Sequence, residues 1–265
     1  MHSSPTTGPL IMGASGCLGR ALARVWPGDA PQPVWQTRAG ADGTLAWDIL
    51  NAPPPDMPAI NGVIVLAGVT RGNTAALAAN TPLAQAGADL GRRLGVPVLV
   101  ASTQAVYGAP TGPVTEQSPC APVTAYGHAK LAMEQAVAAP HVTCLRIGNV
   151  AGCDAIFGAM ARGGVTLDRF PDGQGPRRAM LGPFDLVQVL LALLAAPQRP
   201  PVVNVARPGL IAMEDLLVTA GAGFDWRPAP VTALPVLDLD VTLLQGICPL
   251  PPVDAAAMLA QGTMR

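Results

Sequence analysis

The hydrophobic positions of this chain fall in short, nearly unbroken runs separated by longer segments of mixed composition. Residues 63–68 and 96–101 are two such runs. Continuous rather than alternating hydrophobicity is typical of strands that are buried on both faces of a parallel sheet. Because helix-like segments separate the runs, the pattern predicts an α/β fold of the Rossmann type, with a doubly wound parallel sheet between layers of helices.

The same pattern sets the expected bounds of the elements. A short strand over residues 10–12 opens the sheet. Further strands are expected over residues 34–38, 44–48, 63–68, 96–101, 142–147 and 201–206. Helices are expected over residues 74–94, 131–138, 186–196 and 212–220. A proline-rich loop takes the place of one helix, and the proline-rich segment after Trp226 shows no catalytic pattern.

A glycine-rich turn joins the first strand to a helix-forming segment. Gly13, Gly16 and Gly19 have the spacing G-x-x-G-x-x-G. The first glycine can adopt backbone angles that a Cβ forbids, the second lets a ligand lie against bare backbone, and the third lets the helix pack close to its strand. The amides and positive dipole end of such a helix suit a pyrophosphate, so the turn predicts a dinucleotide site. The turn residues also expected to contact the cofactor are Ser15, Cys17 and Leu18.

The ends of the second, third and fourth strands supply further expected cofactor contacts. The second strand ends at Arg38 without a carboxylate, and a guanidinium suits the 2′-phosphate of NADP(H), which favours NADP(H) over NAD(H). The alternative is that Arg38 is a solvated turn residue. Asp48 either accepts a hydrogen bond from the adenine amino group or begins a turn. The fourth strand ends in small residues that let a cofactor approach: Leu66, Ala67 and Gly68.

Hydroxyl and amine groups follow the fifth strand, at the edge where parallel sheets bind ligands. Thr103 comes directly after the strand, and Tyr126 and Lys130 lie four residues apart, on one face of a predicted helix. An ammonium beside a phenol lowers the phenol pKa, which would suit Tyr126 to move a proton near neutral pH. Thr103 is placed to hold a substrate oxygen in line with that phenol, whereas Ser102 is interpreted as structural.

Together these motifs resemble the extended short-chain dehydrogenases/reductases, in the NAD(P)-dependent epimerase/dehydratase group that acts on nucleotide sugars. The motifs that carry the resemblance are Gly13-x-x-Gly16-x-x-Gly19, Ser102-Thr103-x-x-Val106-Tyr107-Gly108, Tyr126-x-x-x-Lys130 and Leu145-Arg146-x-x-Asn149-Val150-x-Gly152. The resemblance implies hydride transfer between the nicotinamide and a hydroxyl or ketone carbon of a sugar or sugar nucleotide.

The resemblance also implies roles for individual residues. Tyr126 would be the acid/base, and Lys130 would hold the nicotinamide ribose and tune Tyr126. Thr103 fills a catalytic position usually held by serine. Asn80 matches a helix asparagine common in the group, and Asn149 is expected to meet the substrate phosphate or sugar.

The second half of the chain resembles the family less closely. Arg178 precedes Asp185 by seven residues, which is the family's spacing for an arginine that binds the substrate diphosphate. The aromatic and acidic residues that follow this arginine in the family are absent here, so a solvated basic loop is the alternative. We expect residues 1–160 to form an NAD(P)-binding Rossmann domain, with part of 183–208 returning to it, and residues 161–265 to form a small, interrupted substrate lobe.

Composition narrows the possible partners. Of 265 residues, 50% are hydrophobic and 12% are charged, with a net charge of −1 and no cationic block, which argues against nucleic acid or an anionic membrane as partner. The five cysteines form no C-x-x-C pair and are interpreted as buried thiols of a reducing compartment. Residues 1–7 lack the pattern of a secretion signal, so a cytoplasmic location is expected, and no metal site is predicted.

Several functional alternatives remain open at this stage. An epimerase would keep its nicotinamide bound, whereas a reductase would exchange it in each cycle. A non-catalytic NAD(P)-binding sensor or regulatory protein is the alternative from another class, although such proteins typically lack the tyrosine and lysine pair. A homodimer formed through the helices at 74–94 and 126–138 is expected from the family.

Overall fold

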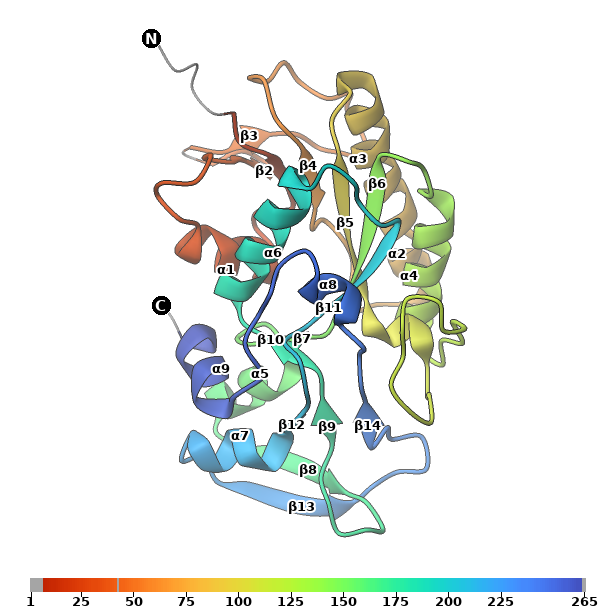
Figure 1. The fold of residues 1–265 in the computed structure, drawn as a ribbon, viewed down its shortest axis with the longest axis vertical. Helices are drawn as coiled ribbons and strands as arrows, with labels where there is room; N and C mark the ends of the chain where they lie inside the picture. The colour runs from red at the N-terminus through yellow and green to blue at the C-terminus, as the bar shows by residue number, and fades with distance from the viewer. Residues whose placement is uncertain (1–6, 42, 264–265) are drawn as a thin grey trace.

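A seven-stranded parallel sheet forms the centre of the protein, as the computed structural model shows for the described residues 7–41 and 43–263 (Figure 1). Its strands are β1 (Leu10–Met12), β2 (Val34–Thr37), β3 (Leu45–Ala46), β4 (Val63–Val65), β5 (Val98–Thr103), β6 (Val142–Ile147) and β11 (Val202–Val205). They lie in the order β3-β2-β1-β4-β5-β6-β11, and every neighbouring pair is parallel. The predicted Rossmann-type fold is therefore confirmed.

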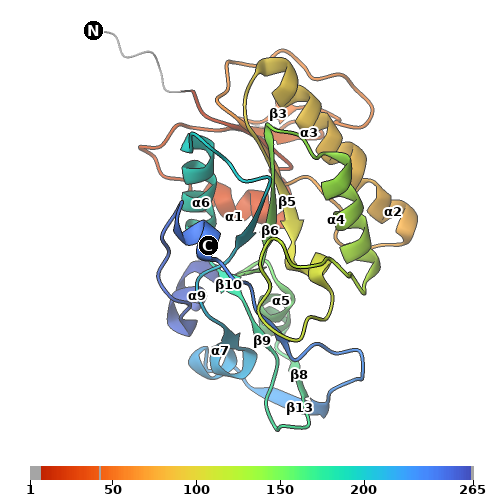
Figure 2. The same cartoon turned by 45° about the vertical axis from the view of Figure 1, so that its right-hand side comes forward.

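Helices cover both faces of this sheet (Figure 2). On one face α1 (Cys17–Val25) packs against α6 (Pro183–Ala195), and on the other α3 (Asn80–Leu94) packs against α4 (Ala125–Ala136). Alternate residues of one strand enter different cores, because successive side chains of a strand point to opposite faces. Ile11 of β1 lies in the core with Leu186, whereas its neighbour Met12 lies in the core with Met133.

The remaining elements lie at the carboxyl ends of the strands, in the lower part of Figure 1. They are the 3-10 helix η1 (Gln104–Tyr107), the helices α5 (Ala155–Arg162), α7 (Met213–Thr219), α8 (Thr242–Gln245) and α9 (Ala255–Gly262), and the strands β7 (Asn149–Val150), β8 (Val165–Arg169), β9 (Arg177–Arg178), β10 (Met180–Leu181), β12 (Ile211–Ala212), β13 (Phe224–Pro228) and β14 (Val236–Leu237). A third core, which includes Phe157, Leu216 and Met258, holds several of them together.

One expected helix is interrupted in the structure. The predicted helix over 74–94 is split into α2 (Thr74–Ala78) and α3, which meet at Ala79. The Asn80 side chain lies at this break, where its Nδ2 donates to the carbonyl oxygens of Leu77 and Val69 while its Oδ1 accepts from the Val69 amide. This amide side chain ties the helix start to the loop that follows β4.

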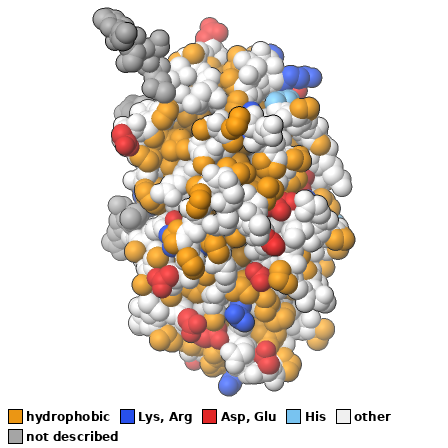
Figure 3. All heavy atoms as spheres, in the orientation of Figure 1, with side chains coloured by type: hydrophobic (Ala, Val, Ile, Leu, Met, Phe, Trp, Pro, Cys, Tyr) orange, Lys and Arg blue, Asp and Glu red, His pale blue; other side chains and the backbone are white. Residues whose placement is uncertain are grey.

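Charged side chains are sparse on the face seen in Figure 3, where they lie singly among hydrophobic and polar atoms. Within the described residues, no helix is both long and apolar enough to span a bilayer.

Candidate cofactor and active site

Two adjoining cavities lie where β1, β4 and β5 end. The first, of about 490 Å³, is lined by residues that include Gly13, Gly16, Gly19, Thr103, Tyr126 and Lys130. The second, of about 380 Å³, is lined by residues that include Ser15, Thr37, Arg38, Asp48 and Ala67. Gly13, Gly16, Leu66 and Gly68 line both cavities. The structure thus brings together most of the site residues predicted from the sequence, and Cys17 and Leu18 also line the first cavity.

The glycine-rich turn has the geometry of a cradle for a ligand. Gly13 has a φ of +92°, and a Cβ there would lie 2.6 Å from the Ala67 amide nitrogen. A Cβ on Gly19 would lie 2.5 Å from the Ala14 carbonyl oxygen, so this glycine lets α1 pack against the turn. A Cβ on Gly16 would meet only the Gly13 oxygen, at 3.3 Å, which leaves its outer side open. The start of α1 is therefore accessible to a pyrophosphate.

A buried glutamine that the motif analysis missed holds this turn in place. Gln36 on β2 accepts a hydrogen bond from the Gly13 amide at 2.9 Å and donates one to the Trp47 carbonyl oxygen at 2.6 Å. The sequence did contain a sign of this role, since Gln36 is a polar residue in the middle of a predicted strand. A polar side chain that is buried there must find hydrogen-bond partners inside the protein.

Tyr126, Thr103 and Lys130 converge on the first cavity. Thr124 caps α4 by accepting from the Gly127 amide at 3.0 Å, which places Tyr126 in the first turn of the helix. Burial raises the pKa of Tyr126, and a hydrogen bond with Thr103 partly opposes the rise. The expected lowering of this pKa by the Lys130 ammonium is not found, since Lys130 is not among the groups that shift it.

The Lys130 ammonium instead lies against the end of β5. Its Nζ donates to the Ala101 carbonyl oxygen at 2.7 Å and lies 3.6 Å from the Met133 sulfur. Burial lowers the pKa of Lys130 to about 8, while Cys144 and Glu134 oppose this shift. An amine with this pKa is partly neutral at mildly alkaline pH, and it can donate to a hydroxyl in the cavity that it lines.

A buried network of charged and polar side chains supports α4 from below. Arg146 on β6 donates to both carboxylate oxygens of Glu134 on α4, with the shortest distance 2.8 Å from Nη2 to Oε2. Ser102 donates to the same carboxylate, and Arg146 Nη1 donates to the Tyr107 hydroxyl at 3.0 Å. Ser102 therefore has the structural role expected of it, whereas Glu134 was missed although it lies one helical turn beyond Lys130.

Asn80 and Asn149 differ in where they lie. Asn80 does not line either cavity but holds the backbone at Val69, next to Gly68. Asn149 lines the first cavity, where its Nδ2 donates to Asp154 at 3.1 Å and its Oδ1 accepts from Gln104 at 2.8 Å. Burial raises the pKa of Asp154, a cavity-lining carboxylate that the sequence analysis did not select.

Arg178 is not brought to the cavity. Its guanidinium is bonded to backbone carbonyl oxygens, at 2.7 Å for Leu234, 3.1 Å for Pro235 and 2.8 Å for Arg177. These bonds hold β9 beside β14. The Arg178 guanidinium therefore binds backbone oxygens of the protein itself and does not line the cavity where the substrate contact was expected.

The interpretation of the cysteines as buried thiols is wrong for most of them. Cys144 is buried, Cys17 is exposed, and Cys120, Cys153 and Cys248 are half-buried. All five are free thiols. Among the residues that the structure describes, no group of three His, Cys, Asp or Glu side chains is placed to hold a metal ion.

Comparison with known proteins agrees with this arrangement. The model of the NAD dependent epimerase/dehydratase family matches residues 9–206. No curated protein matches the chain in sequence.

Three solved structures illustrate the likeness in fold. MoeE5 in complex with UDP-glucuronic acid and NAD is 22% identical, with a TM-score of 0.76 over 96% of this chain and 97% of that chain. TunA, an NAD-dependent NDP-hexosamine 5,6-dehydratase involved in tunicamycin biosynthesis, is 21% identical, with a TM-score of 0.77 over 98% of each chain. The UDP-glucuronic acid 4-epimerase of Bacillus cereus in complex with NAD is 18% identical, with a TM-score of 0.75 over 96% of this chain and 97% of that chain. Because the family model covers most of the chain and the site residues lie around one cavity, the protein belongs to the NAD-dependent epimerase/dehydratase family of enzymes.

Proposed function

We propose that the protein is an NAD(P)-dependent oxidoreductase or epimerase of the extended short-chain type, acting on a hydroxyl or ketone of a sugar nucleotide. The observation that carries the proposal is that Thr103, Tyr126 and Lys130 line the same cavity as the glycine-rich turn. Nucleotide sugars are proposed as substrates because MoeE5 has been solved with UDP-glucuronic acid and with UDP-glucose.

The residues present fit a nicotinamide dinucleotide. The open outer side of Gly16 and the start of α1 would hold the pyrophosphate, and the second cavity would take the adenosine. Lys130 would hold the nicotinamide ribose from its position beside Gly68, where a Cβ would lie 3.4 Å from Nζ. When bound, the cofactor supplies a carbon that accepts and returns hydride.

The protein's own part in the chemistry is to move a proton and to orient the substrate. The Tyr126 hydroxyl would give a proton to, or take one from, the substrate oxygen at the carbon that exchanges hydride. Thr103, which lines the same cavity as Tyr126, would hold the same oxygen in line. Asn149 would meet the sugar or phosphate from the opposite wall of the cavity, where the Gln104 and Asp154 side chains fix its orientation.

Arg38 supports a preference for NADP(H). It is exposed at the end of β2 and lines the second cavity, where it can reach a 2′-phosphate. The solved relatives carry NAD, so titrations with both NADH and NADPH belong in every assay. We also propose a homodimer through the helices α3 and α4, which pack side by side on one face of the sheet.

Replacement of Tyr126 by Phe tests the proposal. The substitution removes one oxygen atom, so we expect turnover of a panel of sugar nucleotides to fall by about 10²- to 10⁴-fold, the usual contribution of a positioned acid/base. The chain has two tyrosines, and Tyr107→Phe is the matched control. Tyr107 is buried away from the cavity against Arg146 and Asn204, so its loss should lower stability and leave the chemistry in place.

Intact turnover in the Tyr126→Phe variant would contradict the assignment. Wild-type protein that binds NAD(P)H and turns over no sugar nucleotide would favour the sensor alternative. Nicotinamide retained through purification would indicate an epimerase, and NADPH consumption with a ketone substrate would indicate a reductase.

A further inference from the structure

We propose that Cys17 and Cys153 form a reversible disulfide that closes the pyrophosphate end of the cofactor site. The two residues are 136 positions apart in sequence, since one begins α1 and the other precedes α5. Bridge formation depends only on the two thiols, whereas its effect on cofactor binding rests on the proposed function.

The fold brings the two cysteines close together, because both line the same two cavities. The Cys17 sulfur lies 3.9 Å from the carbonyl oxygen of Gly152, the residue directly before Cys153. Burial raises the pKa of the Cys153 thiol, and the neighbouring Cys17 thiol raises it further. Two free thiols on neighbouring segments form a disulfide when backbone movement brings their Cα atoms to within about 7 Å.

Both thiols can be reached by small molecules. Cys17 is exposed, and both cysteines line the cavity of about 490 Å³ that holds Tyr126 and Lys130. Both also line another cavity of about 230 Å³, which Arg20 and Arg24 line as well. The contrast within the chain is Cys144, which is buried on β6.

The chemistry is a two-step oxidation by a peroxide. The exposed Cys17 thiol, as its thiolate, attacks hydrogen peroxide, which gives Cys17 sulfenic acid and one water. The Cys153 thiol then attacks that sulfur, which forms the S–S bond and releases a second water. A dithiol reductant reverses the bridge by thiol–disulfide exchange and is itself oxidised to its disulfide.

The bridge would change the cofactor site directly. Cys17 is the first residue of α1, so it belongs to the turn whose amides would face the pyrophosphate. Cys153 belongs to the segment between β7 and α5, which also lines this cavity. A covalent link between these two segments would cross the space that the phosphates need, so the oxidised protein should not take up the dinucleotide.

Peptide mapping tests bridge formation without reference to activity. The full-length reduced protein is treated with hydrogen peroxide, alkylated at acid pH and digested with trypsin. Cys17 and Cys153 fall in the tryptic peptides 1–20 and 147–162, each of which contains a single cysteine. We expect these two peptides to appear cross-linked and to separate after treatment with a dithiol. Failure to detect the cross-linked pair while other thiols are oxidised would overturn the proposal.

Titration with NADH and NADPH tests the consequence. The oxidised wild type should bind the preferred cofactor at least about tenfold more weakly than the reduced protein, because the turn can no longer accept the pyrophosphate. Cys153→Ser should lose this response to peroxide, whereas Cys248→Ser, which changes a half-buried thiol elsewhere, should keep it. A cross-linked wild type that binds cofactor as well as the reduced form would overturn the switch.

The two proposals fail in different ways. A reduced protein that binds neither NADH nor NADPH would contradict the proposed function, and the cross-linked peptide would still report on the thiol pair. A reduced protein that binds cofactor and never forms the bridge would contradict only the proposed Cys17–Cys153 disulfide.

Discussion

Lys130 is the only lysine in the chain, and its ammonium is buried with Nζ 2.7 Å from the Ala101 carbonyl oxygen. Burial lowers its pKa from 10.5 to about 8. A lysine whose folded-state pKa lies below the unfolded value binds its proton more weakly in the folded protein. The penalty is therefore complete below pH 8 and is relieved as the pH rises towards 10.5.

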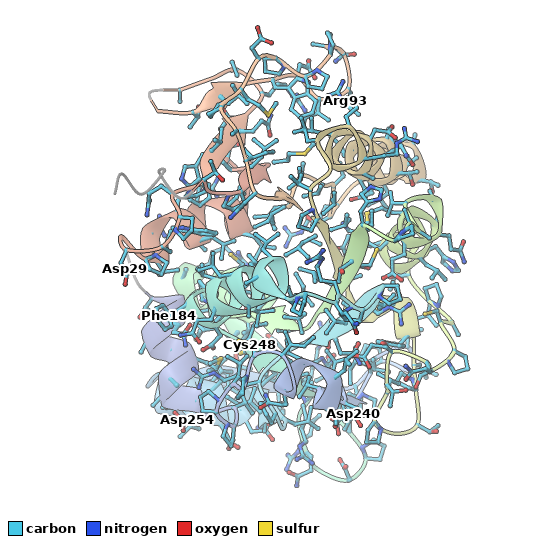
Figure 4. All side chains as sticks on the ribbon, turned by 45° about the horizontal axis from the view of Figure 1, so that its top comes forward. Asp29, Arg93, Phe184, Asp240, Cys248 and Asp254 are labelled. Atoms are coloured by element: carbon cyan, nitrogen blue, oxygen red, sulfur yellow. The ribbon has the colours of Figure 1, made fainter. Side chains whose placement is uncertain are left out.

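Lys130→Met should remove this pH dependence. Between pH 8 and pH 10.5, the free energy of unfolding of the wild type should rise by about 3 kcal/mol relative to that of the variant. Urea denaturation on both sides of the interval measures it. Arg93→Met is the control, since Arg93 lies exposed on α3, where Figure 4 labels it. A difference that is flat with pH would show that Lys130 has an ordinary pKa.

At the scale of single residues, motif spacing identified the side chains that line the cavity but not their surroundings. Tyr126, Lys130 and Thr103 could be predicted because a helical turn and a strand end place them together. The raised pKa of Tyr126 could not be predicted, because burial causes it and motif spacing does not show how far a side chain is buried. Arg178 matched the family in spacing, yet carbonyl oxygens of residues 234–235 take up its donors.

At the scale of elements, α4 is held by an ion pair rather than by apolar contacts alone. The helix carries Tyr126 and Lys130 on the side of the cavity, and Glu134, one turn further on, binds Arg146 of β6. Burial disfavours the charge on Arg146, but its hydrogen bonds to Glu134 outweigh this and raise its pKa. The pair therefore fixes how α4 sits on the sheet.

Glu134→Gln should destabilise the protein by about 3–5 kcal/mol, because it leaves the Arg146 charge buried without a counterion. Asp89→Asn is the matched control. It breaks an exposed pair with Arg92 at the same N–O distance of 2.8 Å, and such pairs contribute about 0–1 kcal/mol. Thermal and urea unfolding measure both variants. Equal losses of unfolding free energy in the two variants would show that the buried Glu134–Arg146 pair matters no more for stability than the exposed pair.

Two elements with apolar sequences were predicted with nearly the bounds that the structure gives them. β6 has the predicted bounds, and α6 was found within a few residues, because their runs are long and apolar. The helices α5 and α9, of eight residues each, were not predicted. An aspartate caps each of them, Asp154 for α5 and Asp254 for α9, which was the available sign of a helix start.

At the scale of the molecule, the helix α9 near the C-terminus is hydrogen-bonded to the start of α6. Gln261 of α9 accepts hydrogen bonds from the amides of Phe184 and Asp185 at the start of α6, and it donates to the Asp185 carboxylate at 3.1 Å. Asp185 is itself paired with Arg207 in a buried salt bridge of 2.7 Å. Figure 4 shows Phe184 at the start of α6 beside α9, which begins after Asp254.

Gln261→Ala should release this helix. The substitution removes three hydrogen bonds to the start of α6, two of them to the buried Asp185, and we expect a cost of about 1–3 kcal/mol. Gln85→Ala removes only a 3.4 Å contact to Asp89 within one helix and should cost about 0.5 kcal/mol or less. Unfolding experiments compare the two, and limited proteolysis with thermolysin reports whether residues 255–262 become cleavable. Equal stability and equal cleavage of the two variants would show that Gln261 does not hold α9 against α6.

The position of β11 in the sheet has a consequence for synthesis of the chain. β11 covers the edge of β6, although α5, β8 and α6 separate the two strands in sequence. A ribosome must therefore translate beyond residue 205 before the sheet is complete, and until then the nascent protein displays an unpaired strand. Such an edge readily pairs with other chains, so premature termination within this region would produce fragments prone to aggregation.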